Sequence, residues 1–584
     1  MPRRAALTAL AAFAAFALSV NPAVAAVGVE DPGGGAGAAP ASVPSAPVSL
    51  AVLVPLTVRP TTSGLIDAAT LAAYTEPLGV LTRQLDAVIG TPAVIGIDPM
   101  IIASIRVLGT SAPASAISWL ERLQSAGNET FALAYADADL ATLAHAGALG
   151  LRDPLGFDFA IDPKNFGPAD TASPTPTASP TPTATSAPEP SPTPTTGAPD
   201  GRPALPTDAS EVLAWSYTLQ SIAWPADGTV TAGELGDLSR SGYQDVVLSS
   251  SNVSATDSAL VDLEGIHGIV SDAGITELVR QIAYSSDPNG SQDALDRVNS
   301  ALAGMAAVSP GRTVVATLDR RWPLGALDLH ALFADLDAQG SVRAVGLSTV
   351  LTGAHPDAKI AEEPAGDPRA DQVASVLHAA DEESRFATVA TVQGAITQPR
   401  RLAMLALLGV AWLRGTDDWS AQVTAFLSDS VKLRQSVKIV AGGDLVVGSG
   451  ATNIPVTVSN ALSVPVTVYV NVESPKSVLQ VRAQNVPLTV EPGSSNKAAI
   501  PVAALSNDRV TTTVTLSSVD GVAIGDPDHV NIDLHPGWES LGTALVVALL
   551  VLVFGGGIAR NILKRRASRR TASTDPSAAE ARGD

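Results

Sequence analysis

Acidic residues follow most of the apolar runs in the first two thirds of this sequence, and tryptophan and arginine stand close to several of them. Carboxylates accept hydrogen bonds from hydroxyl groups, and an indole offers a flat apolar face, so this combination suits the recognition of sugars. The residues that we expect to bind such a ligand are Asp98, Asp137, Asp139, Trp224, Asp272, Arg320 and Trp322.

Two further acidic residues are candidates for catalysis. Glycoside hydrolysis needs two carboxyl groups that flank the bond to be cleaved. We select Asp227 and Asp319, which follow the fourth and the seventh apolar run of the chain. If these runs are strands of one barrel, their carboxyl ends share the face on which barrel enzymes carry their sites.

A structural role for these carboxylates stays open. An aspartate between a strand and a helix often caps the helix through its side chain. Asp98, Asp137 and Asp272 all precede helical patterns. The acidic residues could therefore form a catalytic pair, line a saccharide or peptide groove without catalysis, or serve the fold alone.

Several kinds of chemistry are excluded by what the sequence lacks. It has no cysteine, and its seven histidines show no pair at metal-ligand spacing. The paired aspartates and H-x-x-x-H motif of metal-dependent polysaccharide deacetylases are missing, as are glycine-rich phosphate loops and the G-x-S-x-G and H-E-x-x-H motifs. We therefore expect no metal and no cofactor. A net charge of −21 also argues against nucleic acid as a partner.

The elements that must position these residues are apolar strands that alternate with amphipathic helices, which indicates a parallel sheet covered on both faces. Eight strands in residues 48–363 match the number in a (β/α)8-like barrel. An open doubly wound sheet and two smaller α/β domains are the alternatives. The expected strands are Val48–Val58, Ala93–Asp98, Thr130–Asp139, Ser221–Gly228, Asp245–Ser251, Gly265–Asp272, Arg312–Asp319 and Val342–Leu351.

A stretch rich in proline, threonine and serine interrupts this alternation at residues 167–203. Such a composition cannot bury enough apolar surface to fold, so we expect disorder. Only three strands precede it, too few for a separate domain, and we interpret it as an insertion at the amino-terminal rim of the barrel, opposite any site. Its hydroxyl side chains make it a candidate for O-glycosylation.

The rest of the chain is predicted to be multidomain, with a helical segment at residues 364–437 and an immunoglobulin-like β-sandwich at 438–536. Residues 1–25 resemble a cleaved secretory signal, followed by a flexible lead-in at 26–47. The apolar run 541–563 is long enough for a transmembrane helix, and the basic residues of the tail 564–584 place that tail in the cytoplasm. We expect a single-pass protein of the cell membrane.

The segments YADADLATLAHAG, LSRSGYQDVVLSS, TVVATLDRRWP and IPVTVSNALSVPVTVYV carry a resemblance to an uncharacterised family of actinobacterial single-pass envelope proteins. Members are typically encoded near the flippase for lipid-linked peptidoglycan precursors. The resemblance implies a role in the cell envelope and a membrane partner such as that flippase. It implies no activity and no catalytic residues.

Taken together, these features favour an extracytoplasmic envelope protein that binds a cell-wall glycan or a membrane partner in cell-wall assembly. One alternative is a glycoside hydrolase-like enzyme acting on cell-wall polysaccharide, and another is a structural scaffold for a flippase. Carboxylates of Asp227 and Asp319 that face each other in a cleft, roughly 5–10 Å apart, would favour the enzyme.

Overall fold

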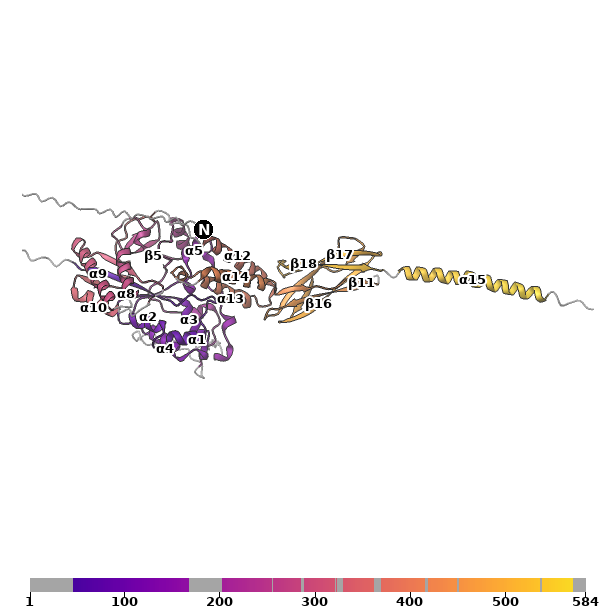
Figure 1. The fold of residues 1–584 in the computed structure, drawn as a ribbon, viewed down its shortest axis with the longest axis horizontal. Helices are drawn as coiled ribbons and strands as arrows, with labels where there is room; N and C mark the ends of the chain where they lie inside the picture. The colour runs from indigo at the N-terminus through magenta and orange to yellow at the C-terminus, as the bar shows by residue number, and fades with distance from the viewer. Residues whose placement is uncertain are drawn as a thin grey trace, which may run out of the picture. The chain divides into compact units, whose positions relative to one another are not determined.

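The structure is a computed structural model. It contains an α/β domain, a β-sandwich and a long C-terminal helix (Figure 1). The expected signal at 1–25, the lead-in up to residue 45, residues 168–201 of the insertion and the end of the tail lie outside the described residues. The structure describes residues 46–167, 202–254, 256–284, 288–320, 322, 329–361, 369–414, 418–448, 451–535 and 538–570.

Strands form at all eight of the expected places in the α/β domain. The sequence did not predict β6 (Leu260–Asp262), which pairs antiparallel with β7. The third, the fourth and the eighth strand are also shorter than expected, and helical turns begin at Tyr135 and Leu347, soon after the third and the eighth strand end. The eight strands are β1 (Val48–Leu56), β2 (Val94–Ile97), β3 (Thr130–Ala132), β4 (Ile222–Ala223), β5 (Asp245–Ser249), β7 (His267–Ser271), β8 (Thr313–Thr317) and β9 (Val342–Ala344).

The parallel strands form a curled sheet in the order β3-β2-β1-β8-β7-β5-β4, and β9 pairs with the start of β1. Side chains on the concave face form a core of their own, which includes Leu53, Ile269 and Val315. Phe131 of β3 and Trp224, next to β4, join the same core from the two ends of the sheet, with ring centroids 5.9 Å apart. The sheet is therefore a half-barrel.

The expectation of a closed eight-stranded barrel is wrong at the junction of β3 and β4. Pairing begins there, since the Leu219 N–H donates to the Thr130 carbonyl at 2.9 Å. It ends at Ser221, whose φ of 61° is rare for a residue other than glycine. The Ser221 carbonyl accepts instead from the Asp245 N–H of β5. Among the described strands, β3 and β4 are the two ends of the sheet.

Helices cover the convex face of the sheet, where their apolar sides are buried (Figure 1). In α8, for example, Ile275, Val279 and Ile282 are buried at helical spacing. These helices are α1 (Ala68–Thr75), α2 (Val80–Val88), α3 (Pro99–Arg106), α4 (Ala114–Gln124), α5 (Leu140–His145), α6 (Ala209–Leu213), α7 (Ala232–Arg240), α8 (Ala273–Tyr284), α9 (Pro288–Val308) and α10 (Leu329–Gln339). The short helix α11 (Leu347–Leu351) instead contributes Leu347 and Val350 to the core on the concave face.

The segment predicted to be helical contains α12 (Ala370–Phe386), α13 (Gly394–Leu407) and α14 (Trp419–Arg434). Helix α13 packs closely on the α/β domain at Gly64, where a Cβ atom would lie only 2.3 Å from the Leu402 carbonyl oxygen. The Asp139 N–H also donates to the Leu408 carbonyl at 2.9 Å. The chain after α13 is thereby held beside the carboxyl ends of the strands.

The period of two in the next segment produces the expected two-sheet sandwich. Along β13, for example, every second residue from Val466 to Val472 is a buried valine. All the strand pairings within the sandwich are antiparallel except that of β11 with β18. One sheet contains β10 (Val437–Val440), β12 (Thr452–Asn460), β16 (Ser494–Ala504) and β14 (Leu479–Val481), and the other contains β11 (Leu445–Val447), β18 (Ala523–Leu534), β17 (Asp508–Ser517), β13 (Val466–Glu473) and β15 (Val486–Val490).

Helix α15 (Trp538–Arg570) contains the apolar run of the C-terminal region. Its part Gly542–Arg566 is long and apolar enough to cross a membrane, with a mean hydropathy of 2.4. By length and composition, α15 therefore suits a single-pass anchor.

Candidate functional site

A cavity of about 240 Å³ opens at the carboxyl edge of the curled sheet, and we call it the carboxyl-edge cavity. Both residues expected to be catalytic line it, together with one of the expected binding residues. Its lining consists of Ala226, Asp227, Thr229, Arg280, Leu318, Asp319, Arg320, Val410 and Leu413.

Four separate elements supply this lining. Asp227 lies in the turn after β4, which the Thr229 hydroxyl closes by donating to the Ala226 carbonyl at 2.8 Å. Asp319 and Arg320 follow β8, and Arg280 comes from α8. Val410 and Leu413 belong to a 3-10 helix after α13 and give the cavity an apolar wall.

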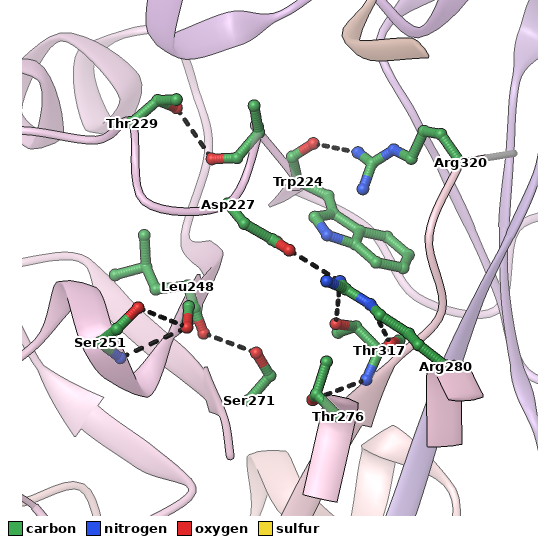
Figure 2. Close-up of polar contacts among 12 residues, drawn as sticks. Trp224, Asp227, Thr229, Leu248, Ser251, Ser271, Thr276, Arg280, Thr317 and Arg320 are labelled. Carbon is green, nitrogen blue, oxygen red and sulfur yellow. Dashed lines mark hydrogen bonds and ion pairs between the residues drawn. The ribbon is translucent and has the colours of Figure 1, made fainter. Parts of the chain in front are cut away.

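Arg280 pairs with Asp227, and sequence reasoning did not select it. Its Nη2 lies 2.7 Å from Oδ2 of Asp227 and donates to the Thr317 hydroxyl at 3.0 Å, while its Nε donates to the Thr317 carbonyl at 3.1 Å (Figure 2). The side chain is nearly buried, so these contacts fix it. A signal did exist, since Arg280 falls on the apolar face of α8 between Val279 and Ala283.

Arg320 is held in a similar way on the other side of the Trp224 indole (Figure 2). Its Nε donates to the two carboxylate oxygens of Asp137 at 3.2 and 3.3 Å, and its Nη2 donates to the Trp224 carbonyl. The guanidinium carbon lies 4.3 Å from the centre of the indole, a cation–π geometry. Trp224 therefore contacts Arg320, which lines the cavity, but is not itself one of the lining residues.

Both guanidinium groups keep unused hydrogen-bond donors. The contacts of Arg280 and Arg320 occupy Nε and Nη2 in each case, and no described residue accepts from either Nη1. Because both side chains line the cavity, these nitrogens are available to an oxygen-rich ligand.

Asp137 is buried behind Arg320 and serves to hold it. Burial raises the pKa of its carboxyl to about 6, although the Arg320 charge acts in the opposite direction. Asp137 and the preceding Ala136 have φ values of 50° and 56°, in the left-handed region that costs free energy for such residues. The chain accepts this strain where it brings the carboxylate to Arg320. Asp137 is thus a positioning residue and does not cap α5.

The capping alternative applies to three of the expected binding residues. Asp98 accepts from the Met100 N–H at the start of α3, and burial next to Asp137 raises its pKa well above the ordinary range. Asp139 caps α5 and also binds Arg369 at 3.2 Å. Asp272 accepts from the N–H groups that begin α8. None of the three lines the carboxyl-edge cavity.

Trp322, the last of the expected binding residues, belongs to the core. Its indole N–H donates to the Pro55 carbonyl at 2.6 Å, and its ring is only 1% exposed. In the part of the chain that the structure describes, no group of three or more histidine, aspartate or glutamate side chains could hold a metal ion.

Asp272 offers a direct test of the distinction between a cap and a binding residue. Asp272→Ala removes the acceptor for two N–H groups of α8 and is expected to lower the free energy of unfolding by about 1 kcal/mol in urea denaturation. Asp272→Asn keeps a side-chain acceptor, so it should lower the free energy of unfolding by only a few tenths of the loss in Asp272→Ala. Unchanged stability of Asp272→Ala would contradict the cap.

Comparison with known proteins gives a family and no activity. A model of a family of unknown function, DUF6049, matches residues 35–577. No curated protein sequence matches the chain.

Solved structures resemble only small parts of the chain. Native α-2-macroglobulin of Escherichia coli is 17% identical over 18% of this chain and 7% of that one, with a TM-score of 0.15. SSP-19, an MSP-domain protein like family member of Caenorhabditis elegans, is 12% identical over 16% of this chain and 94% of its own, with a TM-score of 0.13. The E. coli chaperone DraB is 12% identical over 17% of this chain and 55% of its own, also with a TM-score of 0.13. The chain thus spans less than a tenth of the macroglobulin, and at these TM-scores the likenesses carry no argument about function.

Proposed function

Since the chain belongs to the DUF6049 family, whose function is unknown, we propose a function from its own residues: a membrane-anchored extracytoplasmic protein that binds a cell-wall glycan in the carboxyl-edge cavity. The observation that carries this proposal is the lining of the cavity, in which Asp227 and Asp319 come together with Arg280 and Arg320.

The lining matches the chemistry of a saccharide. Hydroxyl groups of a sugar donate to carboxylates and accept from guanidinium groups. The unused Nη1 donors of Arg280 and Arg320 supply the second kind of contact, and Leu318, Val410 and Leu413 supply an apolar wall for the C–H face of a ring. A cavity with a few fixed polar groups on an apolar wall is typical of small-ligand sites.

The anchor completes the proposal. Helix α15 is long and apolar enough to cross a membrane and ends in basic residues. By the positive-inside rule, these residues support a cytoplasmic C-terminal end with the rest of the chain outside. The resemblance to envelope proteins adds a membrane partner, such as the flippase for lipid-linked precursors, that α15 would meet in the plane of the membrane.

Binding is favoured over hydrolysis by the contacts of Asp227. Its Oδ2 lies 2.7 Å from Arg280, which itself is fixed by Thr317, so the carboxylate is already engaged. A glycoside hydrolase-like activity is the second candidate, because Asp227 and Asp319 do line one cavity. Release of reducing ends from cell-wall polysaccharide, abolished by both Asp227→Asn and Asp319→Asn, would establish it.

A saccharide array followed by calorimetry on the full chain in lipid nanodiscs tests the binding function. We expect a cell-wall saccharide to bind, and Arg280→Gln to weaken it at least tenfold because two polar contacts and the position of Asp227 are lost. Leu413→Trp is the second variant, since it fills the cavity from its apolar wall and leaves every ion pair intact. The matched control is Arg240→Gln, whose guanidinium pairs with Asp237 on the exposed surface of α7. Full affinity in both cavity variants would refute the proposal.

A further inference from the structure

The junction at which β3 and β4 separate contains a second cavity, of about 300 Å³, which we call the junction cavity. Ala132 lines it from β3, Ile222 lines it from β4 and Ser221 lines it from just before β4, and Tyr217 and Tyr243 add two aromatic rings. It shares no lining residue with the carboxyl-edge cavity. It lies where the pairing between β3 and β4 ends at Ser221, whose φ is 61°.

The backbone of Ala132 faces this junction. Along a parallel strand, successive residues direct their N–H and C=O groups to opposite sides. The Leu133 N–H donates to Ile97 of β2, whereas the Thr130 carbonyl accepts from Leu219 on the other side. Ala132 is on the same side as Thr130, and no described residue bonds to its N–H or its C=O.

The backbone of Ile222 also faces the junction, from the edge of β4. The Ser221 carbonyl bonds to Asp245 of β5, and Ile222 is the residue opposite Asp245 in the register. By the same alternation, the N–H and C=O of Ile222 point away from β5 and toward β3, and no described residue bonds to them. Two strand edges therefore face each other across the cavity, and each offers one unused donor and one unused acceptor.

We propose that the junction cavity binds the acetamido group of an N-acetylated amino sugar. Backbone groups at an inner edge need partners. A trans amide directs its C=O and its N–H in opposite directions. One such amide can therefore accept from one edge and donate to the other, and it would close the sheet where Ser221 leaves it open.

The length of the two edges selects a single amide rather than an extended peptide. β3 ends at Ala132, and β4 consists of only two residues, so the edges offer one residue each. A peptide that adds to a sheet needs a row of such groups. The rings of Tyr217 and Tyr243 provide flat apolar surfaces for the sugar.

Arg152 holds one wall of the cavity in place. Its guanidinium donates to the Leu149 carbonyl at 3.1 Å and to the Ser241 carbonyl at 3.2 Å, so it joins the chain after α5 to the chain after α7. It also lies over the ring of Tyr243. The cavity therefore has a preformed frame, which suits a small rigid ligand.

The test uses N-acetylglucosamine as the probe and glucosamine, which has the same ring without the acetyl group, as its comparison. In calorimetry on the full chain in nanodiscs we expect saturable binding of N-acetylglucosamine and at least tenfold weaker binding of glucosamine. Ala132→Pro removes an N–H that no strand pairing uses, so the sheet should tolerate it, and we expect a loss of affinity of at least tenfold. Ala132→Leu, which fills the cavity, should act in the same way, with Ala146→Leu at the exposed end of α5 as its matched control.

The possible outcomes separate this inference from the proposed function. The inference is overturned if N-acetylglucosamine does not bind, if glucosamine binds equally well, or if both Ala132 variants keep full affinity. If Leu413→Trp abolishes the binding and the Ala132 variants do not, the probe occupies the carboxyl-edge cavity instead, and only the proposed function stands.

Discussion

Replacement of Arg320 by methionine is expected to lower the free energy of unfolding by about 3–5 kcal/mol. Arg320 is only 5% exposed, and its guanidinium is the cation that faces the buried carboxylate of Asp137 at 3.2 Å. Methionine fills a similar volume but leaves that carboxylate without its charge partner, and it also leaves the Trp224 carbonyl without this donor. Urea denaturation followed by tryptophan fluorescence measures the change.

Two further variants decide whether the loss of stability comes from a buried carboxylate that has lost its charge partner. Adding Asp137→Asn to Arg320→Met should restore part of the lost stability, because an uncharged amide costs less to bury and asparagine tolerates a left-handed backbone. Arg240→Met removes an arginine from an exposed pair and should change stability by less than about 0.5 kcal/mol. A loss below about 1 kcal/mol in Arg320→Met would contradict this account of the pair.

Alternation of apolar strands and helices is the part of the fold that the sequence could predict. Strands buried on both faces, such as β1 and β8, leave continuous apolar runs, and all eight predicted places contain a strand. The opening of the sheet between β3 and β4 could not be predicted, because the pairing ends at Ser221, whose positive φ is a conformation that serine does not mark in a sequence.

The candidate site was predicted in part for a similar reason. Residues directly after strands, such as Asp227, Asp319 and Arg320, could be placed at one edge of the sheet from the chain order alone. Arg280 comes from the middle of a helix and Leu413 from a segment more than ninety residues after β8, so only packing brings them there. The choice between a cap and a ligand for Asp98, Asp139 and Asp272 depends on side-chain direction, which spacing does not encode.

The pattern of these carboxylates suggests how the fold divides its acidic residues. Those on the side of β2 and β3 are buried and engaged by helix ends or by Arg320 and Arg369, and they stabilise the frame. Those after β4 and β8 line the cavity. The frame and the site share Arg320, which touches Asp137 on one side and the cavity on the other, so ligand affinity and stability should respond together to the charge of Asp137.

That charge makes the stability of the protein depend on pH. The pKa of Asp137 is about 6 in the folded protein, against about 3.9 for an aspartate in an unfolded chain. The folded state therefore keeps a proton that the unfolded state has released, and its stability falls as the pH rises from about 4 to about 6. The loss levels off above that range and amounts to about 3 kcal/mol at most.

Asp137→Asn is expected to remove this part of the pH dependence, because the amide does not titrate. The charges that act on Asp137 are those of Arg320, Asp139 and Asp319, and Asp98 is coupled to it from α3. The substitution also changes the hydrogen bonds that Asp137 accepts from Arg320 at every pH, so the informative quantity is the difference between two pH values. Urea midpoints at pH 4.5 and pH 7.5 should diverge less in Asp137→Asn than in the wild type. Burial also raises the pKa of Asp98, so Asp98 contributes a slope of the same sign in both proteins. Identical profiles across pH 4–6 would show that Asp137 keeps its ordinary pKa.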